Sequence, residues 1–333
     1  MCRMTGVRKA AARLGPLKRV LITGATGFIG RSLVAQLIDS RRFSIRAAVR
    51  RESREWPDSV ERVVLGDLAP DSDWRMALLD LDVVVHLAGR AHVMREEAID
   101  PLAEFRRVNV ECTLNLAKQA AATASVRRFV FMSSVGVNGT ATASVPFSEW
   151  DNPSPQEAYA VSKYEAETAL KLLAAQTGLE VGIIRPPLVY GPDAPGNFGR
   201  LCRLVRRGLP LPFGAIHNRR SLVALGNLVD FIVTCMEHPS AANETFLVSD
   251  GDDLSTTDLV CRLAHAMGHR ARLVPVPASA LMAGATLLGK RELAQRLLGS
   301  LQVDISKARR VLGWVPPISV DEGMRRVTAS QQV

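Results

Sequence analysis

Residues 19–30 of the chain read Arg-Val-Leu-Ile-Thr-Gly-Ala-Thr-Gly-Phe-Ile-Gly. The first five form a short apolar run, which is typical of a buried strand. Three glycines follow at intervals of three, and the apolar residues from Ile29 to Ile38 then recur at helical spacing. A strand, a glycine turn and an amphipathic helix are the context in which a glycine triplet binds a dinucleotide. This stretch therefore predicts the start of a nucleotide-binding fold.

The three glycines of this stretch, Gly24, Gly27 and Gly30, are expected to have separate roles. One permits a tight turn, one lets the backbone approach a pyrophosphate, and one allows the helix to pack closely on the strand. The N-terminus of the helix then offers free N–H groups and a partial positive charge to phosphates. The alternative is a purely structural turn, but the order of the elements favours nucleotide binding.

Four more apolar runs predict strands that alternate with helical segments: Ser44–Val49, Arg62–Leu65, Leu81–His86 and Arg128–Met132. This alternation predicts an α/β fold, a Rossmann-type doubly wound parallel sheet, over residues 18–190. Residues 191–333, where the periodicity becomes irregular, are predicted to form mainly a smaller C-terminal substrate-binding lobe, with some segments returning to the sheet. Residues 1–17 are basic and lack the apolar region of a secretory signal, so we expect a basic N-terminal arm.

The composition narrows the class of protein. Of the 333 residues, 47% are hydrophobic and 23% are charged, which is typical of a globular enzyme-sized chain. The net charge of +9 suits anionic partners such as phosphorylated ligands. Aromatic residues make up only 5%, which argues against a base-stacking nucleic-acid surface. The five cysteines are scattered without a CxxC pair, so we expect no disulfide framework, no metal and a cytoplasmic location.

One apolar run lies near the C-terminus. Residues from Val274 to Gly289 carry no charge, but they are too few for a spanning helix, which needs about 20. We therefore expect no transmembrane segment. The run predicts a buried helix, and the alternative is a membrane-surface patch.

Polar residues follow the predicted strands, where the ligands of parallel α/β sheets bind. Arg50 and Arg51 follow the second strand, in the place where an NAD site usually has an acid. Arginine there suits a 2′-phosphate and favours NADP; the alternative is a solvated basic loop. Ser134 follows the last of these strands.

Tyr159 and Lys163 form a YxxxK pattern in a segment of helix formers, which places them one turn apart on one helix face. A phenol has a pKa near about 10, and a neighbouring ammonium is expected to lower it, so that the group exchanges a proton near neutral pH. Ser134, 25 residues upstream, can bind the substrate oxygen while a hydride moves. The alternative is an exposed tyrosine–lysine pair, but the glycine turn upstream favours catalysis.

Together these motifs resemble the extended short-chain dehydrogenase/reductases, in their NAD(P)-dependent epimerase/dehydratase group. The resemblance runs from about residue 18 to about residue 328. Besides the motifs above, it rests on Gly66-Asp67, His86 to Gly89, Asn109-Val110, Ser133-Ser134, Arg185 to Pro192, Asp304 to Ala308 and Leu312 to Trp314.

The resemblance implies that Ser134, Tyr159 and Lys163 are catalytic and that Asn109 is a supporting structural group. It implies a dinucleotide cofactor, NADP or NAD, with NADPH favoured because of Arg50. The implied cofactor contacts are Gly24, Thr26, Gly27, Phe28, Ile29, Gly30, Arg50, Arg51, Asp67, Leu68, Leu87, Ala88, Gly89, Tyr159, Lys163 and Pro186.

The substrate side is implied in the same way. Ser134, Tyr159, Asn197 and Arg220 would bind a nucleotide sugar of the UDP-linked kind, with Arg220 on the diphosphate. The chain departs from the family at Asn138, where members often have a tyrosine, and this leaves the sugar pocket open. Val135-Gly136 replaces the Asp-Glu pair of the dehydratases, which argues against dehydration.

The leading functional hypothesis is the NAD(P)H-dependent reduction of a 4-keto nucleotide sugar, of the UDP-N-acetyl-6-deoxyhexos-4-ulose type, in bacterial surface-polysaccharide synthesis. The alternative is a 4-epimerase of UDP-hexoses or UDP-N-acetylhexosamines that keeps NAD tightly bound. A non-catalytic dinucleotide-binding sensor is the third interpretation. The resemblance also suggests a homodimer that forms through the YxxxK helix.

Overall fold

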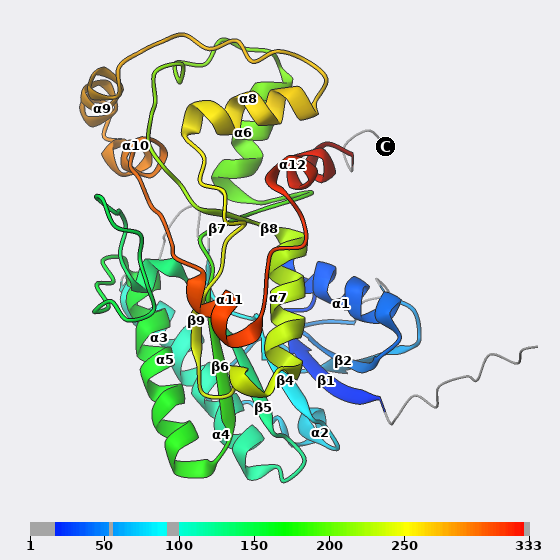
Figure 1. Cartoon of the computed structure of the whole chain (residues 1–333). Helices are drawn as coiled ribbons and strands as arrows, with labels where there is room; N and C mark the ends of the chain where they lie inside the picture. The colour runs from blue at the N-terminus through cyan, green and yellow to red at the C-terminus, as the bar shows by residue number, and fades with distance from the viewer. Residues whose placement is uncertain (1–16, 53–55, 92–99, 330–333) are drawn as a thin grey trace, which may run out of the picture.

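The computed structural model describes residues 17–52, 56–91 and 100–329 (Figure 1). All but the last residue of the expected N-terminal arm lies outside this part of the chain. The strands are β1 Lys18–Thr23, β2 Phe43–Val49, β3 Val60–Val64, β4 Val83–His86, β5 Arg128–Met132, β6 Glu180–Arg185, β7 Leu188–Tyr190, β8 Leu222–Ala224 and β9 Thr245–Leu247.

The α-helices are α1 Phe28–Ser40, α2 Arg75–Leu78, α3 Pro101–Arg106, α4 Cys112–Ala122, α5 Ala158–Thr177, α6 Gly196–Arg206, α7 Leu225–Glu237, α8 Thr256–Ala266, α9 Ala278–Leu287, α10 Arg291–Leu298, α11 Ser306–Leu312 and α12 Val320–Ala329. The chain also forms a π-helix, η1 Arg107–Glu111, and two 3₁₀ turns, η2 Val135–Val137 and η3 Pro239–Ala241.

Seven strands form one parallel sheet in the order β3-β2-β1-β4-β5-β6-β9. From β1 the chain adds strands outward to β3, and it then returns to place β4 on the other side of β1. At such a reversal the loops leave in opposite directions, which opens a crevice at the carboxyl ends of the strands. The predicted α/β fold with a doubly wound parallel sheet is thus confirmed.

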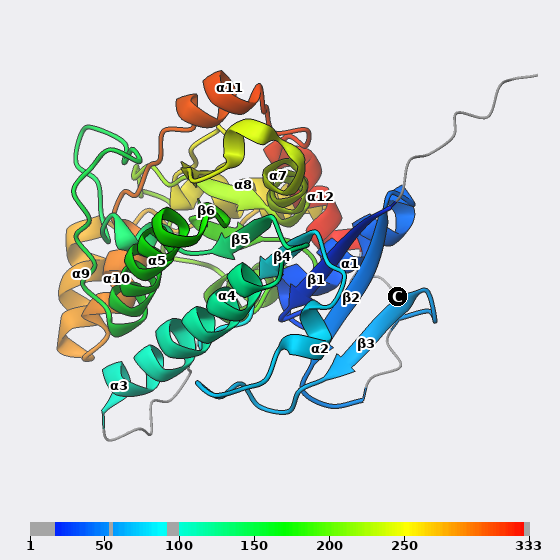
Figure 2. The same ribbon diagram turned by 90° about the horizontal axis from the view of Figure 1, so that it is seen from below.

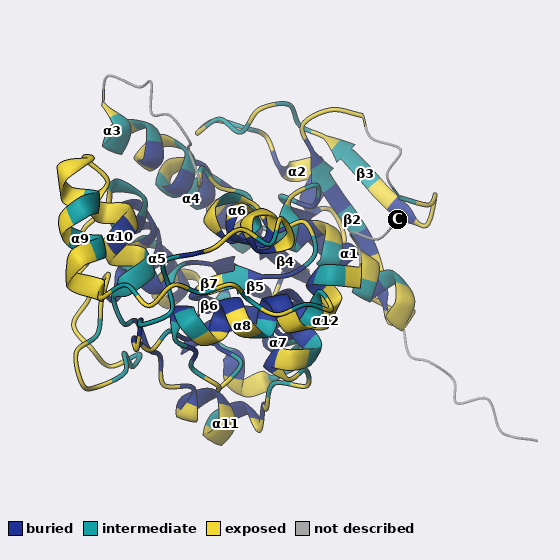
Figure 3. Ribbon diagram, turned by 90° about the horizontal axis from the view of Figure 1, so that it is seen from above, coloured by how far each residue is buried: buried dark blue, intermediate teal, exposed yellow. Residues whose placement is uncertain are grey.

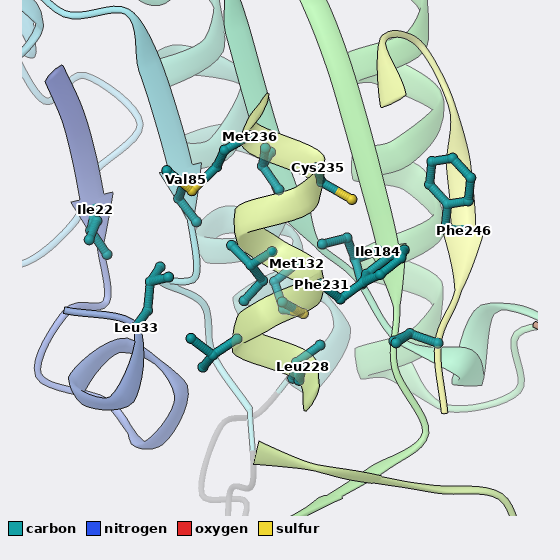
Figure 4. Close-up of a cluster of buried hydrophobic side chains, with 14 of the residues drawn as sticks. Ile22, Leu33, Val85, Met132, Ile184, Leu228, Phe231, Cys235, Met236 and Phe246 are labelled. Atoms are coloured by element: carbon teal, nitrogen blue, oxygen red, sulfur yellow. The ribbon is translucent and has the colours of Figure 1, made fainter. Parts of the chain in front are cut away.

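Helices cover both faces of the sheet, as Figure 2 shows. Successive residues of a strand point to opposite faces, so Ile22 of β1 joins the core under α1 and α7, while Leu21 joins the core under α4 and α5. Figure 4 shows the first of these cores, in which Phe231 of α7 lies among side chains from the sheet. Because both faces are covered, the central strands β4 and β5 are buried along their whole length.

A third core lies beyond the carboxyl ends of the strands. It joins α6, α8 and α12 to the small parallel pair β7–β8, with Tyr190 and Phe198 among its buried residues. The chain does not stay in this region after residue 191, because α7 packs on the sheet and β9 pairs with β6. Residues 191–329 therefore contribute both to the lobe and to the sheet.

The predicted strands differ from the observed ones only at their ends. The third, expected at Arg62–Leu65, forms as β3 at Val60–Val64, and the fourth begins at Val83 rather than Leu81. The carboxylate of Asp82 accepts the backbone N–H of Arg19 at 2.8 Å. This side-chain hydrogen bond therefore stands where the pairing of β4 with β1 would otherwise begin. Terminal residues of strands are decided by such contacts and not by the apolar pattern.

The prediction of a buried helix between Val274 and Gly289 is wrong about the burial. A helix forms there, α9, but none of its residues is buried, and Figure 3 shows it mainly in the colour of exposed residues. Its main packing partner is α10, and it belongs to none of the three cores. Within residues 17–52, 56–91 and 100–329, no helix is long and apolar enough to cross a bilayer.

A buried ion pair ties α5 to the sheet. Glu167 of α5 and Arg185 at the end of β6 are 1% and 3% exposed, and their charged groups are 2.5 Å apart. The carboxylate also accepts a hydrogen bond from the hydroxyl of Ser133 at 2.5 Å, and Arg185 donates to Asn138 at 3.0 Å. A charge buried in this way is stable only while its partners are present.

We expect Glu167→Gln to lower the free energy of unfolding by about 3–5 kcal/mol, because Arg185 would keep a buried charge without a counterion. Urea unfolding followed by circular dichroism measures this change. The matched control is Glu165→Gln on the same helix, since Glu165 pairs with Arg106 near the surface. Such a pair contributes about 0–1 kcal/mol, and equal losses in the two variants would contradict the argument.

Candidate functional site

The glycine turn after β1 depends on two positions that exclude a side chain. Gly24 has a φ of +68°, and a Cβ there would lie 2.7 Å from the backbone nitrogen of Ala88. A Cβ on Gly30 would lie 2.2 Å from the carbonyl oxygen of Gly24. The first contact brings the loop after β4 against the turn, and the second lets α1 pack onto it. Gly27 precedes α1, whose start has no acidic residue in its first turn and no side-chain cap.

A cavity of about 570 Å³ lies beside this turn, at the carboxyl ends of β1, β2 and β4. This volume is within the range of small-molecule sites. The predicted cofactor residues that line it are Gly24, Thr26, Gly27, Arg50, Asp67, Leu68, Leu87, Ala88 and Gly89.

Other predicted cofactor residues do not line this cavity. Gly30 is buried under the turn, and Ile29 and Phe28 pack against the cores, with Phe28 reaching both the first and the third. Arg51 is exposed. Pro186 is buried, and its carbonyl accepts the N–H of Val135 at 3.0 Å.

Sequence reasoning missed several lining residues, of which Trp74 is the most informative. Its side chain is 1% exposed. Its indole N–H is buried and has no hydrogen-bond partner within the described part of the chain. Buried donors are almost always paired, so this donor fits a ligand that brings an acceptor. Arg90, Arg107 and Val108 also line the cavity.

The cavity therefore fits a dinucleotide. Its backbone cradle leaves no room for side chains, the N-terminus of α1 is uncapped, and a buried donor lacks a partner. A helix N-terminus of this kind binds phosphate through N–H groups and the helix dipole.

A buried chain of hydrogen bonds supports the loop after β4. His86 Nδ1 lies 2.7 Å from the hydroxyl of Thr23, and its Nε2 lies 2.9 Å from that of Thr113. The Thr23 hydroxyl also accepts the N–H of Ala88 at 3.2 Å. Burial, together with the charge of Lys163, lowers the pKa of His86 to about 3, so the ring is neutral.

The YxxxK pair lies on α5, as predicted. Lys163 is buried, and its ammonium donates to the carbonyl of Met132 at 2.9 Å. The same nitrogen is 5.9 Å from the centre of the Tyr159 ring. A Cβ on Gly89 would lie 3.3 Å from it. Lys163 therefore joins the end of β5, the tyrosine and the loop that borders the cavity.

Ser134 approaches the same helix from β5. It begins the 3₁₀ turn η2, where its hydroxyl accepts the N–H of Gly136 at 3.1 Å. A Cβ on Gly136 would lie 3.3 Å from that hydroxyl and 3.2 Å from the Cβ of Ala160, the neighbour of Tyr159. The serine turn thus packs against the first turn of the helix that carries Tyr159.

The electrostatics of the pair differ from the expectation. Burial raises the pKa of Tyr159 to about 12. Burial also lowers the pKa of Lys163 to about 8, against a raising effect of Glu167. Desolvation disfavours the charged form of each group, so in the protein alone the expected lowering of the tyrosine pKa does not occur.

Asn109 supports this arrangement from the π-helix η1. Its amide donates to the Ser162 hydroxyl at 3.0 Å and to the Arg90 carbonyl at 3.1 Å. Its amide oxygen accepts the N–H of Arg90 at 2.8 Å. Asn109 is fully buried, so it locks the loop after β4 to α5. π-helical turns of this kind often occur at functional sites.

Asn138, at the position of the family's tyrosine, is buried in a polar network. Its amide donates to the Ser148 carbonyl at 2.8 Å, and its oxygen accepts from Arg185 at 3.0 Å. The side chain is 2% exposed. Its hydrogen-bonding groups are therefore occupied within the protein.

The two remaining predicted residues lie on the lobe. Arg220 precedes β8, and its guanidinium donates to the Gly299 carbonyl at 3.0 Å. Burial and the nearby charge of Arg296 lower its pKa. Asn197 is exposed in the first turn of α6. Arg296, which no motif indicated, is an additional cation of this region, and it pairs with Glu157 just before α5.

Comparison with known proteins shows which proteins this chain is similar to. The profile of the NAD dependent epimerase/dehydratase family matches residues 20–249. A UDP-glucose 4-epimerase of Vibrio cholerae is 45% identical over 311 residues, which cover 93% of this chain and 94% of the relative. An N-acetyl-α-D-glucosaminyl-diphospho-ditrans,octacis-undecaprenol 4-epimerase of Escherichia coli O157:H7 is 26% identical, over 92% and 93%.

A solved structure shares the fold. UDP-glucuronic acid 4-epimerase from Bacillus cereus, in complex with NAD, superposes with a TM-score of 0.75 at 22% sequence identity. The match covers 94% of this chain and 96% of the other.

The lowered pKa of Lys163 predicts a pH dependence of stability. The pKa is about 8 in the folded protein and 10.5 for the free side chain, so between these values the unfolded chain binds more protons. The contribution of this lysine to the free energy of unfolding then rises with pH, by at most about 1.4 kcal/mol per unit.

Urea unfolding of the wild type and of Lys163→Met tests this sign. The stability of the wild type relative to the variant should increase as the pH rises above about 8. A difference that is constant or that falls with pH would contradict the assignment.

Proposed function

The chain belongs to the NAD dependent epimerase/dehydratase family, and from that premise we propose that it is a 4-epimerase of UDP-sugars. The observation that carries this proposal is the 45% identity to the Vibrio cholerae UDP-glucose 4-epimerase over almost the full length of both chains. It favours the alternative hypothesis drawn from the sequence over the leading one, the 4-keto reductase.

Epimerisation requires that carbon 4 lose a hydride and its hydroxyl a proton, and that both return after the keto sugar has turned. An oxidised dinucleotide held in the cavity would supply the hydride acceptor and a positive charge. Tyr159 takes the hydroxyl proton as the hydride leaves and returns it when carbon 4 is reduced. Two half-reactions of opposite direction leave no net change in oxidation state.

The other residues of α5 and β5 support this proton transfer. Lys163, fixed by the Met132 carbonyl at 2.9 Å, holds a positive charge 5.9 Å from the centre of the Tyr159 ring. Together with the charge of a bound oxidised dinucleotide, it would offset the burial that raises the pKa of Tyr159. Ser134 donates its hydroxyl to the carbon-4 oxygen. Asn109 keeps the loop that borders the cofactor cavity in register with α5 through its bonds to Arg90 and Ser162.

For the cofactor we favour NAD over NADP. Arg50 is the residue that suits a 2′-phosphate, but its guanidinium lies 3.7 Å from the Asp67 carboxylate, and both line the cavity. A 2′-phosphate would have to share the arginine with this carboxylate and would be repelled by it. The carboxylate instead suits the neutral ribose hydroxyls of NAD.

For the sugar nucleotide we assign the diphosphate to Arg220. Burial and Arg296 both lower the pKa of this guanidinium, and an anionic ligand would oppose both effects. A diphosphate would supply the missing negative charge and accept a planar pair of hydrogen bonds. Asn197 at the start of α6 is a second candidate contact on the lobe.

Incubation of the purified protein with UDP-glucose labelled with deuterium at carbon 4 tests the function. We expect UDP-galactose that keeps the label at carbon 4 and no net change in absorbance of the dinucleotide, because the hydride returns to the carbon it left. Label lost to solvent would contradict the return of the hydride, and activity only when NADPH and a 4-keto sugar are supplied would favour the reductase.

Tyr159→Phe should lower this turnover by roughly 10²–10⁴-fold, the usual contribution of a general acid–base group, while binding of the dinucleotide is retained. The matched control is Tyr164→Phe, which removes a hydroxyl from a partly exposed tyrosine on the same helix. An active Tyr159→Phe variant would overturn the assignment.

The cofactor preference is tested on the extensively dialysed protein. We expect acid to release NAD, and the emptied protein to bind NAD several-fold more tightly than NADP. Asp67→Asn should reduce this preference by about fivefold, the effect of one exposed charge pair. Arg50→Ala, which removes the cation, should not improve NADP binding, and an excess of NADP in the purified protein would contradict the assignment.

A further inference from the structure

The helix α9 is apolar along its whole length and has no core to cover it. Residues 278–287 read Ala-Ser-Ala-Leu-Met-Ala-Gly-Ala-Thr-Leu, without a charge. Leu287 is 88% exposed and Leu288, the next residue, is 74% exposed. The Thr286 hydroxyl donates to the Met282 carbonyl at 2.8 Å, so it is satisfied within the helix. Large exposed side chains gathered in this way mark a surface that binds something apolar.

The charge around α9 indicates which apolar partner it fits. Between Asp258 and Glu292 the chain carries no acidic residue. The exposed cations of this stretch are Arg270, Arg272, Lys290 and Arg291. The last two lie at the start of α10, next along the chain from α9, whereas Arg270 and Arg272 line a separate pocket with Arg207. Exposed leucines can bury in the boundary between headgroups and acyl chains, and neighbouring lysine and arginine side chains are attracted to anionic lipids.

The length of α9 is also consistent with that position. Ten residues form a helix of about 15 Å, half of the roughly 30 Å of a hydrocarbon core. Such a helix can lie along the membrane surface and cannot cross it. A second copy of the chain is a poorer partner, because it would bring the same cations against those of the first.

The helices α9 and α10 form a hairpin, and the α10 end of this hairpin is fixed to the substrate side of the protein. Arg296 of α10 pairs with Glu157 at 2.6 Å, two residues before Tyr159. The Asn218 amide donates to the carbonyls of Leu297 and Gly299, at 3.1 and 2.9 Å. The hairpin of α9 and α10 is therefore held next to Arg220, which donates to the same Gly299 carbonyl, and α9 projects from the edge of the molecule (Figure 1).

We propose that the hairpin α9–α10 docks the protein on an anionic lipid bilayer, with α9 in the interface and the substrate side of the lobe beside the headgroups. The leucines at the end of α9 bury in the membrane, and the cations that follow bind the lipid phosphates. This surface does not depend on which reaction the site catalyses.

Flotation of the full-length protein with lipid vesicles tests the proposal. We expect binding to phosphatidylcholine vesicles that contain phosphatidylglycerol, weaker binding to phosphatidylcholine alone, and a decrease with salt because the charges are exposed. Leu287→Glu/Leu288→Glu should lower the partition of the protein onto vesicles by at least about tenfold, because the loss of even one buried leucine has an effect of that size.

Two further variants separate the apolar and the electrostatic parts. The control Met76→Glu/Leu79→Glu introduces two acids in the α2 region, where Met76 is 76% exposed and Leu79 is 54% exposed. This variant should bind vesicles as the wild type does. Lys290→Glu/Arg291→Glu should lose most of the response to phosphatidylglycerol and keep the weak binding to phosphatidylcholine.

Each hairpin variant should fold, because the replaced side chains are exposed to solvent. A thermal melt followed by circular dichroism checks this. Turnover of soluble UDP-sugar should be unchanged in Leu287→Glu/Leu288→Glu, so failure of the docking and failure of the epimerase assignment are distinguishable. The proposal is overturned if the wild type does not float with either vesicle. It is equally overturned if the leucine variant only converts a dimer to a monomer in sedimentation, since a second copy would then cover α9.

Discussion

Two stretches of backbone meet at the switch point of the sheet, closer than any side chain would allow. A Cβ on Gly24 would lie 2.7 Å from the nitrogen of Ala88, so the turn after β1 and the loop after β4 are in direct contact. The cavity between them exists because β1 and β4 are neighbours whose connections leave in opposite directions. The same loop continues to Gly89, beside Lys163, and thus the position of the cofactor cavity also decides where the YxxxK pair must lie.

The chemistry of that pair has a cost that the rest of the fold offsets. Burial opposes the charge of Lys163 and opposes ionisation of Tyr159. A buried charge needs fixed partners, and here the Met132 carbonyl and the carboxylate of Glu167 in the next helical turn supply them. Glu167 is in turn held by Arg185 at the end of β6. The reacting groups are therefore positioned by the sheet and not by flexible loops, which favours accurate geometry.

The sequence predicted the elements that rest on local patterns. The five predicted strands form within two residues of their expected ends, because apolar runs bounded by turns report burial directly. Gly24 and Gly27, together with Arg50 and Asp67 after the next two strands, line one cavity, since parallel strands end at one edge. Trp74 was not predicted, because nothing near it in the sequence marks a ligand contact; only the fold brings this residue to the cavity wall.

The spacing of the glycines, of the apolar residues and of the YxxxK pair predicts a doubly wound sheet and the helix that carries this pair. These features arise from neighbours in the sequence. Long-range packing decided the rest. The apolar run at Val274–Gly289 would have the same sequence pattern in a buried helix and in an exposed one. The helix α9 is exposed because only α10 packs closely against it. Arg296 likewise gains its place beside Glu157 from a contact across 139 residues, which no local pattern encodes.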